Sequence, residues 1–427
     1  MNGLVARAST LDVRNKRLVY LLFSFFVCLN IFPILKLSKN YPDVVINTAS
    51  FLFLVILLVI VSFISYRKKL FSRKGLLMLM GSCALMLALA TYAAVNTATV
   101  EFSLINYLTV PIAIVIFLVI LGNTRLSKED FLSFNSMVIA YTLVACIYNF
   151  IINYKNIFLI KSITSSYEYS FSSFYDNRNT FGLLLAITLG MALYSWGAAK
   201  SELVKFIYII AGFIFAFSLF LTQSRAAILF FFMFAIVYYL LRDGMRGLVK
   251  AALAIISLIV ITTTILGTSY VSDNLIRENS GSSGRGELSA YGLDVYSSSN
   301  VLFGAGFGRP TKNLIAKYEL SSFHSNYITI LVSGGIIQAI FYLSLLIFVS
   351  SNILMLKLYD KKLYAFSAAI LVSYLVYSSI ETVMPFQLYS NNYLISVLVI
   401  YMPSYILNSY KTSTIIAGKQ IWVKRNG

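Results

Sequence analysis

One histidine and three arginines lie in polar segments or at their borders with long apolar ones, and these four side chains are the candidates for chemistry. His324 is the single histidine of the chain. Histidine is the side chain whose ordinary pKa lets it gain and lose a proton near neutral pH. Arg225 lies at the border of an apolar segment, where a guanidinium costs free energy unless it meets an anion or water. Arg178 lies just before another apolar segment, and Arg285 lies inside a long polar segment. These residue types suit proton transfer beside a bound anion.

The residues around the three arginines are small or polar. Arg178 lies in Asp176-Asn177-Arg178-Asn179, Arg225 in Thr222-Gln223-Ser224-Arg225-Ala226-Ala227, and Arg285 in Gly281-Ser282-Ser283-Gly284-Arg285-Gly286-Glu287. Glycines beside an arginine let the chain approach a ligand closely. Each arginine alone has an alternative reading as a snorkelling or loop-pairing residue, and the histidine could be an interfacial residue with only local hydrogen bonds.

The composition indicates that lipid surrounds the elements that hold these residues. Of the 427 residues, 59% are hydrophobic and 12% are charged, whereas an average soluble domain has about 45–50% apolar and about 25% charged residues. The net charge of +18 would suggest nucleic-acid binding in a soluble protein. The basic residues lie in short turns between apolar segments, however, so they are predicted to fix membrane topology and not to bind nucleic acid.

About twelve apolar segments approach the roughly 20 residues that a helix needs to cross a bilayer. The predicted spans are residues 18–35, 43–65, 75–95, 104–122, 131–154, 179–197, 203–222, 224–241, 248–267, 326–350, 363–382 and 391–408. No small-residue cleavage site follows the first segment, so it is predicted to be a helix and not a cleaved signal peptide. The predicted fold class is an all-α integral membrane protein.

The charges of the loops predict the orientation of these helices. Most of the 34 basic residues fall on one side, in loops that include residues 14–17, 67–74, 242–250 and 357–362. Because positive charge marks the cytoplasmic side, both termini are predicted to lie on the cytoplasmic side of the membrane. His324 and the three arginines then share the outer face.

The segment 268–325 is the largest predicted outer loop, and it follows the ninth span. Loops of this length are usually functional or disordered, and its apolar stretches at 290–295 and 314–320 are predicted to form short helices of a folded lid. The chain therefore divides into residues 1–267 with nine spans, the loop 268–325, and residues 326–427 with three spans and a cytoplasmic tail.

Several common signatures are missing from the sequence. It has no Walker-type phosphate loop, no H-E-x-x-H and no G-x-S-x-G, so neither a cofactor nor a bound metal is expected. The segment Gly304-Ala305-Gly306-Phe307-Gly308 is interpreted as a turn where backbone approaches backbone. Cys28, Cys83 and Cys146 lie in apolar segments and are expected to pack as small hydrophobic residues.

The order of the motifs resembles the family of O-antigen ligases and polysaccharide polymerases. The resemblance covers about residues 170–345 and rests on Asn177-Arg178-Asn179, Ser224-Arg225-Ala226, Gly284-Arg285-Gly286, Gly304-Ala305-Gly306 and His324-Ser325-Asn326-Tyr327, together with the long loop after the ninth span. One departure is Ser325, since asparagine often follows the histidine in this family and here it comes one residue later.

The resemblance implies a metal-independent glycosyltransferase of the GT-C type. Its donor would be a glycan on undecaprenyl pyrophosphate, and its acceptor a hydroxyl of a second lipid-linked glycan or of a lipid core. Arg225 and Arg285 would bind the pyrophosphate, because the guanidinium matches phosphate geometry and stays charged. His324 would be the general base. Arg178, Asn177, Asn326 and Arg309 would bind substrate.

The sequence leaves three alternatives to an O-antigen or capsule polymerase. An O-antigen ligase would carry the same motifs. A flippase or transporter for the lipid-linked glycan should show ionisable residues near mid-membrane or paired broken helices, whereas the predicted spans here are almost free of charge. A scaffold without catalysis explains the fewest features. A chain-length regulator protein is a further partner expected of a polymerase.

Overall fold

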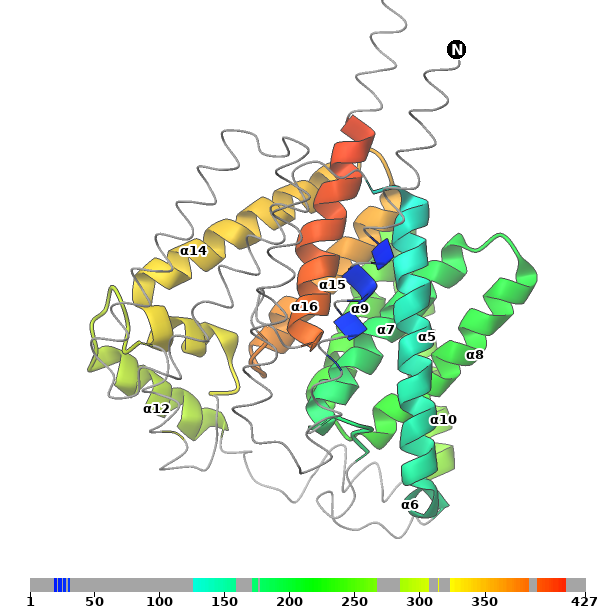
Figure 1. Ribbon diagram of the computed structural model, residues 1–427, viewed down its shortest axis with the longest axis horizontal. Coiled ribbons are helices and arrows are strands. Elements are labelled where there is room, and N and C mark those ends of the chain that lie inside the picture. The colour runs from blue at the N-terminus through cyan, green and yellow to red at the C-terminus, as the bar shows by residue number, and fades with distance from the viewer. Residues whose placement is uncertain are drawn as a thin grey trace, which may run out of the picture.

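The computed structural model describes residues 126–158, 171–175, 177–266, 285–306, 314, 323–383 and 390–411, with residues 19, 20, 22–24, 26, 27 and 30 of the N-terminal segment. Over these residues the chain is helical and contains no strand (Figure 1). One isolated bridge pairs Asn300 with Gly304. The predicted all-α class is confirmed for this part of the chain.

The helices follow one another with short connections over much of the chain. In order they are α5 (Lys128–Ile152), α6 (Tyr154–Phe158), α7 (Arg178–Ala198), α8 (Glu202–Leu221), α9 (Arg225–Asp243), α10 (Met245–Leu266), α12 (Arg285–Ser297), α14 (Asn326–Leu356), α15 (Lys361–Ser378) and α16 (Ser390–Ser396), which continues into the π-helical segment η3 (Val397–Tyr401).

Six helices within the described ranges are long and apolar enough to cross a membrane. They are α5, α7, α8, α9, α14 and the helix over Asn391–Lys411. Helices α10 and α15 also occupy predicted spans, although neither is among the six. The predicted spans at 43–65, 75–95 and 104–122 lie outside the described residues, and the first is described only in part. The chain is a helical membrane protein, and its total of twelve spans stays a prediction.

Side chains that accept from exposed backbone N–H groups fix where several helices begin. Ser127 and Asp130 form a reciprocal capping box at the start of α5. Asp360 accepts from the N–H groups of Lys362 and Leu363 at the start of α15, and it also pairs with Lys128 at 2.6 Å. The first residues of α5 and α15 therefore share one end of the bundle.

Helix α7 forms the centre of the bundle and packs against α5, α8 and α9. Its residues from Phe181 to Ala192 are buried without interruption, as expected for a helix enclosed on all sides. The phenyl ring of Phe234 on α9 lies 3.0 Å from where a Cβ atom on Gly190 would stand, so the missing side chain lets α7 and α9 approach. On its other side Phe234 meets Phe366 of α15 edge to face, with ring centroids 5.8 Å apart.

Helix α14 is interrupted at Gly335, which has a φ of +61°. The segment 298–306 docks onto this break through its main chain: the N–H of Ala305 donates to the Val332 carbonyl at 2.7 Å, and two N–H groups just after Gly335 donate to carbonyls of the segment. Gly304, at a φ of +70°, lies against the same backbone. The predicted close approach of backbone to backbone at Gly304 is confirmed.

Helix α12 lies with α14 to one side of the bundle (Figure 1). It contains the predicted short helix at 290–295, which is therefore confirmed. Gly292 of α12 faces Phe323, whose ring would lie 3.0 Å from an added Cβ atom. Most of the second predicted short helix, at 314–320, lies outside the described residues. Helix α12 and the start of α14 are thus held together next to the site residues.

Candidate active site

All four predicted basic residues lie at the start of a helix. Arg178, Arg225 and Arg285 are the first residues of α7, α9 and α12, and His324 lies two residues before the first residue of α14. The first turn of a helix has N–H groups without intrahelical partners and carries a positive partial charge. Each of the four basic side chains therefore lies at a helix start, where backbone N–H groups also attract an anion.

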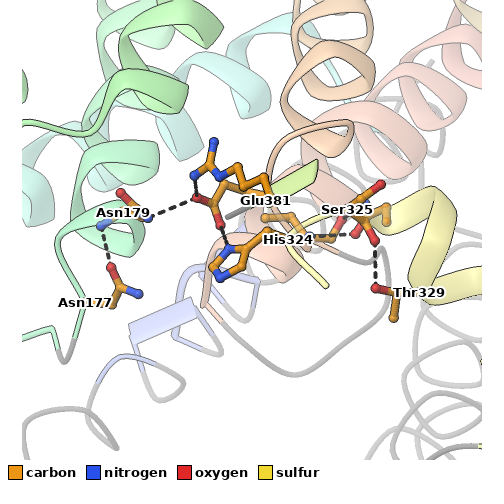
Figure 2. Close-up of polar contacts among 9 residues, drawn as sticks. Asn177, Asn179, His324, Ser325, Thr329 and Glu381 are labelled. Carbon is orange, nitrogen blue, oxygen red and sulfur yellow. Dashed lines mark hydrogen bonds and ion pairs between the residues drawn. The ribbon is translucent and has the colours of Figure 1, made fainter. Parts of the chain in front are cut away.

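A buried carboxylate, Glu381, joins three of these helix starts (Figure 2). One of its oxygens lies 2.9 Å from Nδ1 of His324. The other accepts from Nη2 of Arg285 at 2.7 Å and from Nδ2 of Asn179 at 3.0 Å. Residues separated by about 200 positions in the chain are thereby brought to one place, and the predicted convergence of His324 with Arg285 is present in the structure.

Sequence reasoning missed Glu381. The predicted span 363–382 placed it inside the membrane-crossing segment, whereas α15 ends at Ser378 and leaves Glu381 beyond the helix end. A signal was available, because Glu381 is the only acidic residue between Lys361 and the last residue, Gly427. An isolated carboxylate at the border of an apolar segment is a functional candidate by the argument that was applied to the arginines.

His324 has an unusual backbone conformation that sets the direction of its ring. Its φ is +51°, a value that few residues other than glycine adopt and that costs about 1–3 kcal/mol. Ser325 then returns to extended backbone and α14 begins. If the ionised Glu381 carboxylate accepts from Nδ1–H, the other ring nitrogen, Nε2, keeps its lone pair and can accept a proton. The side chain is 25% exposed, so a ligand can reach it.

The start of α7 is connected to the turn that precedes α9. Nη1 of Arg178 donates to Oε1 of Gln223 at 3.1 Å, and Gln223 lies two residues before Arg225 in the chain. Asn177 caps α7, since its side-chain oxygen accepts from the N–H of Asn179 at 2.7 Å. Both Asn177 and Arg225 are exposed. The predicted residues of α7 and α9 thus lie at a single helix junction.

Asn326 is fully buried and links α14 to the segment that carries Glu381. Its amide nitrogen donates to the carbonyl of Val383 at 2.6 Å, and its amide oxygen accepts from the N–H of Val383 at 2.7 Å. The same nitrogen also lies 3.0 Å from the hydroxyl of Ser378. These contacts fix the backbone on both sides of Glu381. Its predicted contact with substrate stays a prediction, and Arg309 lies outside the described residues.

Residues 210–343 match a family model described as O-antigen ligase. The chain is similar to the O-antigen ligase family. This match confirms the resemblance predicted from the motifs, and the matched residues include Gln223, Arg225, Arg285 and His324. Arg178 and Glu381 lie outside the O-antigen ligase match, on either side of it, and reach the site through the contacts described above. A comparison of the chain with curated proteins gave no match.

Proposed function

We propose that the chain is a polysaccharide polymerase of the bacterial inner membrane. It transfers a glycan from undecaprenyl pyrophosphate to a hydroxyl of an acceptor sugar on the outer face. The observation that carries this proposal is the set of contacts that joins Arg285, His324 and Asn179 at Glu381. These contacts support the proposal because they bring His324, a residue type that can accept a proton, close to Arg285 and to the start of α7.

The donor pyrophosphate binds at the starts of α7, α9 and α12. Arg178, Arg225 and Arg285 supply guanidinium groups, which form paired hydrogen bonds with phosphate oxygens. N–H groups of the first helical turns that have no intrahelical partner add donors that need no side-chain rearrangement. As the glycosidic bond breaks, negative charge grows on the leaving pyrophosphate, and fixed donors stabilise this charge.

His324 activates the acceptor. Its Nε2 takes the proton of the acceptor hydroxyl while the hydroxyl oxygen forms a bond to the anomeric carbon of the donor sugar. The bond from that carbon to the pyrophosphate oxygen breaks, and undecaprenyl pyrophosphate leaves. Glu381 is a positioning residue in this scheme, because it holds the ring through Nδ1 and stabilises the imidazolium that forms. The reaction needs no second carboxylate, since pyrophosphate is already a good leaving group.

Two other functions remain candidates because they fit the same motifs or the same substrate. An O-antigen ligase would use the same donor and transfer the glycan to a lipid core. A flippase would move the lipid-linked glycan without breaking its glycosidic bond. The ionisable cluster around Glu381 favours chemistry over transport, because it lies at the ends of helices and not halfway along them.

The deciding experiment incubates purified protein in detergent with an undecaprenyl pyrophosphate oligosaccharide, in the presence of EDTA, and follows both glycan length and lipid release. Wild type should give ladders of longer lipid-linked glycan, and His324→Ala should give none. Ser298→Ala, at an exposed position beyond the end of α12, is the matched control and should behave as wild type. Transfer only to an added lipid core would establish a ligase, and no turnover with either acceptor would refute the proposal.

A further inference from the structure

The turn between α8 and α9 has a strained geometry at its centre. It consists of residues 222–224, and Gln223 has a φ of +55° although it is not a glycine. The side chain of Gln223 is nevertheless buried, with 3% of the residue exposed. A non-glycine residue is kept in this conformation only where its surroundings require it, and such residues concentrate at functional sites.

The surroundings that hold this turn belong to α7. A Cβ atom added to Gly182, one helical turn after Arg178, would lie 2.8 Å from Cβ of Ser224 and 3.0 Å from Oγ1 of Thr222. The missing side chain of Gly182 therefore lets the turn rest directly on α7. This close packing brings the carboxamide of Gln223 to the guanidinium of Arg178, at 3.1 Å.

The contact that Gln223 makes with Arg178 differs in charge from the contact that Glu381 makes with Arg285. The Arg285 guanidinium pairs with the carboxylate of Glu381 at 2.7 Å, which adds a negative charge beside it. Gln223 contacts Arg178 through a neutral amide oxygen, so this contact orients the guanidinium and itself adds no negative charge. A neutral acceptor is the better choice for an arginine that must attract a phosphate, because an added carboxylate would repel the ligand.

We propose that Gln223 is the positioning residue of the donor pyrophosphate site. Its amide oxygen orients the guanidinium of Arg178, and its left-handed turn aims Arg225, two residues further along, at the same ligand. The inference rests on the proposed function and goes beyond it, since it assigns the orientation of two of the three pyrophosphate-binding arginines to the turn between α8 and α9. The pair of Glu381 and His324 then serves the acceptor.

Two substitutions by side chains about as long as glutamine distinguish the effect of charge at residue 223 from the effect of its hydrogen bond. Gln223→Glu keeps an oxygen at the same distance and adds a negative charge beside Arg178. Gln223→Met removes the acceptor and adds no charge. We expect the KM for the lipid pyrophosphate donor to rise by about tenfold or more in Gln223→Glu, because the added carboxylate offsets the charge of Arg178 and repels the phosphate. The rise should be smaller in Gln223→Met, which loses only the hydrogen bond to the guanidinium. The kcat should also fall, because the oriented guanidinium stabilises the charge that grows on the leaving pyrophosphate, whereas the KM for the acceptor should stay at the wild-type value.

A double-mutant cycle tests whether Gln223 acts through Arg178. In an Arg178→Met background, Gln223→Met should leave the KM for the donor nearly unchanged, because the contact it removes is already absent. Gly182→Ala should raise this KM with Gln223 intact, because its methyl group pushes the turn away from α7. Independent effects of Gln223→Met and Arg178→Met would overturn the inference.

The control variant adds the same negative charge at a position outside the turn 222–224. Ser298 is exposed and lies 13 residues after Arg285, which is about 20 Å along the axis of α12 at 1.5 Å per residue. The KM of Ser298→Glu for the donor should equal that of the wild type. If Ser298→Glu and Gln223→Glu raise the KM for the donor equally, the added charge acts only by general repulsion of the anionic donor, and the inference is overturned. If the wild type turns over the donor and Gln223→Glu has the wild-type KM, only the inference is refuted. If the wild type does not turn over the donor, the proposed function is refuted. If Gln223→Glu does not accumulate in the membrane, the KM of Gln223→Met for the donor and the double-mutant cycle test the inference without it.

Discussion

Glu381 accepts from a histidine, an arginine and an asparagine with two oxygen atoms. Such a group acts on all three partners at once. It selects which nitrogen of the His324 ring carries the proton, it holds the guanidinium of Arg285 in a fixed direction, and it fixes the start of α7 through Asn179. Hydrogen bonds to a buried charge are worth about 1.5–3 kcal/mol each, so the loss of this charge should affect the site more than the loss of any one donor.

Glu381→Gln should lower kcat while the protein still folds. The amide keeps the shape of the carboxylate, but it neither stabilises the imidazolium nor fixes the tautomer. General-base catalysis contributes about 10²–10⁴-fold, so we expect kcat to fall by about a hundredfold. Steady-state kinetics with a lipid pyrophosphate donor measure it. Glu287→Gln, on an exposed residue of α12, is the matched control, and equal kcat values for the two variants would remove Glu381 from the mechanism.

Arg285→Ala should reduce turnover by roughly a hundred- to a thousandfold, by analogy with the loss of one donor that stabilises a transition state. Arg285→Lys should recover only part of this loss, since an ammonium group cannot contact both a carboxylate and a phosphate in the planar geometry of a guanidinium. Single-turnover assays at equal amounts of inserted protein test both variants. Wild-type turnover by Arg285→Ala would show that Arg285 has a structural role and takes no part in the reaction.

The sequence was sufficient to find the cations of the site and insufficient to find their partners. Arg178 and His324 were recognisable because charge is rare in this chain and each lies beside an apolar segment, and Arg285 because glycines flank it. Glu381 escaped because a predicted span three or four residues too long enclosed it. Gln223 escaped because an uncharged residue in a short turn carries no signal until its backbone angle and its contact with Arg178 are known.

At the scale of helices, the break of α14 is the joint between the helix bundle and the segment 298–306. Gly335 replaces helical backbone by a positive φ, and a Cβ atom there would collide with the carbonyl of Leu302. Neither feature can be read from the apolar pattern of 326–350, which predicts one continuous helix. The boundaries of α7, α8 and α9 could be predicted to within about two residues, because polar turns separate them.

Gly335→Ala should destabilise the protein. The substitution combines a strained backbone, which costs about 1–3 kcal/mol, with a collision against main chain that cannot move aside as a side chain can. We expect a lower Tm in detergent, measured by thermal unfolding. Gly286→Ala is the matched control, because nothing lies within 4 Å of the added atom and alanine is favoured over glycine in a helix. A Tm for Gly335→Ala equal to that of Gly286→Ala would contradict the role given to the break.

At the scale of the whole molecule, the charged groups separate along the helices. Lys128 pairs with Asp360 at the end where α5 and α15 begin, whereas Glu381 and its partners lie past the other end of α15. The loop charges predict that the first end is cytoplasmic and the second faces outward. The number of spans that precede α5 decides this orientation, and those spans lie outside the described residues, so the orientation is tested best by chemistry on the intact cell envelope.

Single cysteines at the two ends test the orientation. In a variant without Cys28, Cys83 and Cys146, we expect Ser298→Cys to react with a membrane-impermeant thiol reagent in spheroplasts. Leu358→Cys, at a position that is 80% exposed, should react only after the membrane is permeabilised. The two positions flank α14, whose 31 residues are long enough to cross a bilayer. Labelling of Leu358→Cys in intact spheroplasts would reverse the predicted orientation.

The docking of the segment 298–306 onto α14 also bears on the design of hybrid enzymes. Main-chain hydrogen bonds join the two, and the tight fit needs Gly304 and Gly335. Within the segment, the side-chain oxygen of Asn300 accepts from the N–H groups of Leu302 and Phe303 and so shapes the turn that docks. An exchange of α12 between related proteins should therefore carry the segment through Gly306 together with α12, and donor and recipient should share the two glycines and this asparagine so that the grafted helix keeps its register with the bundle.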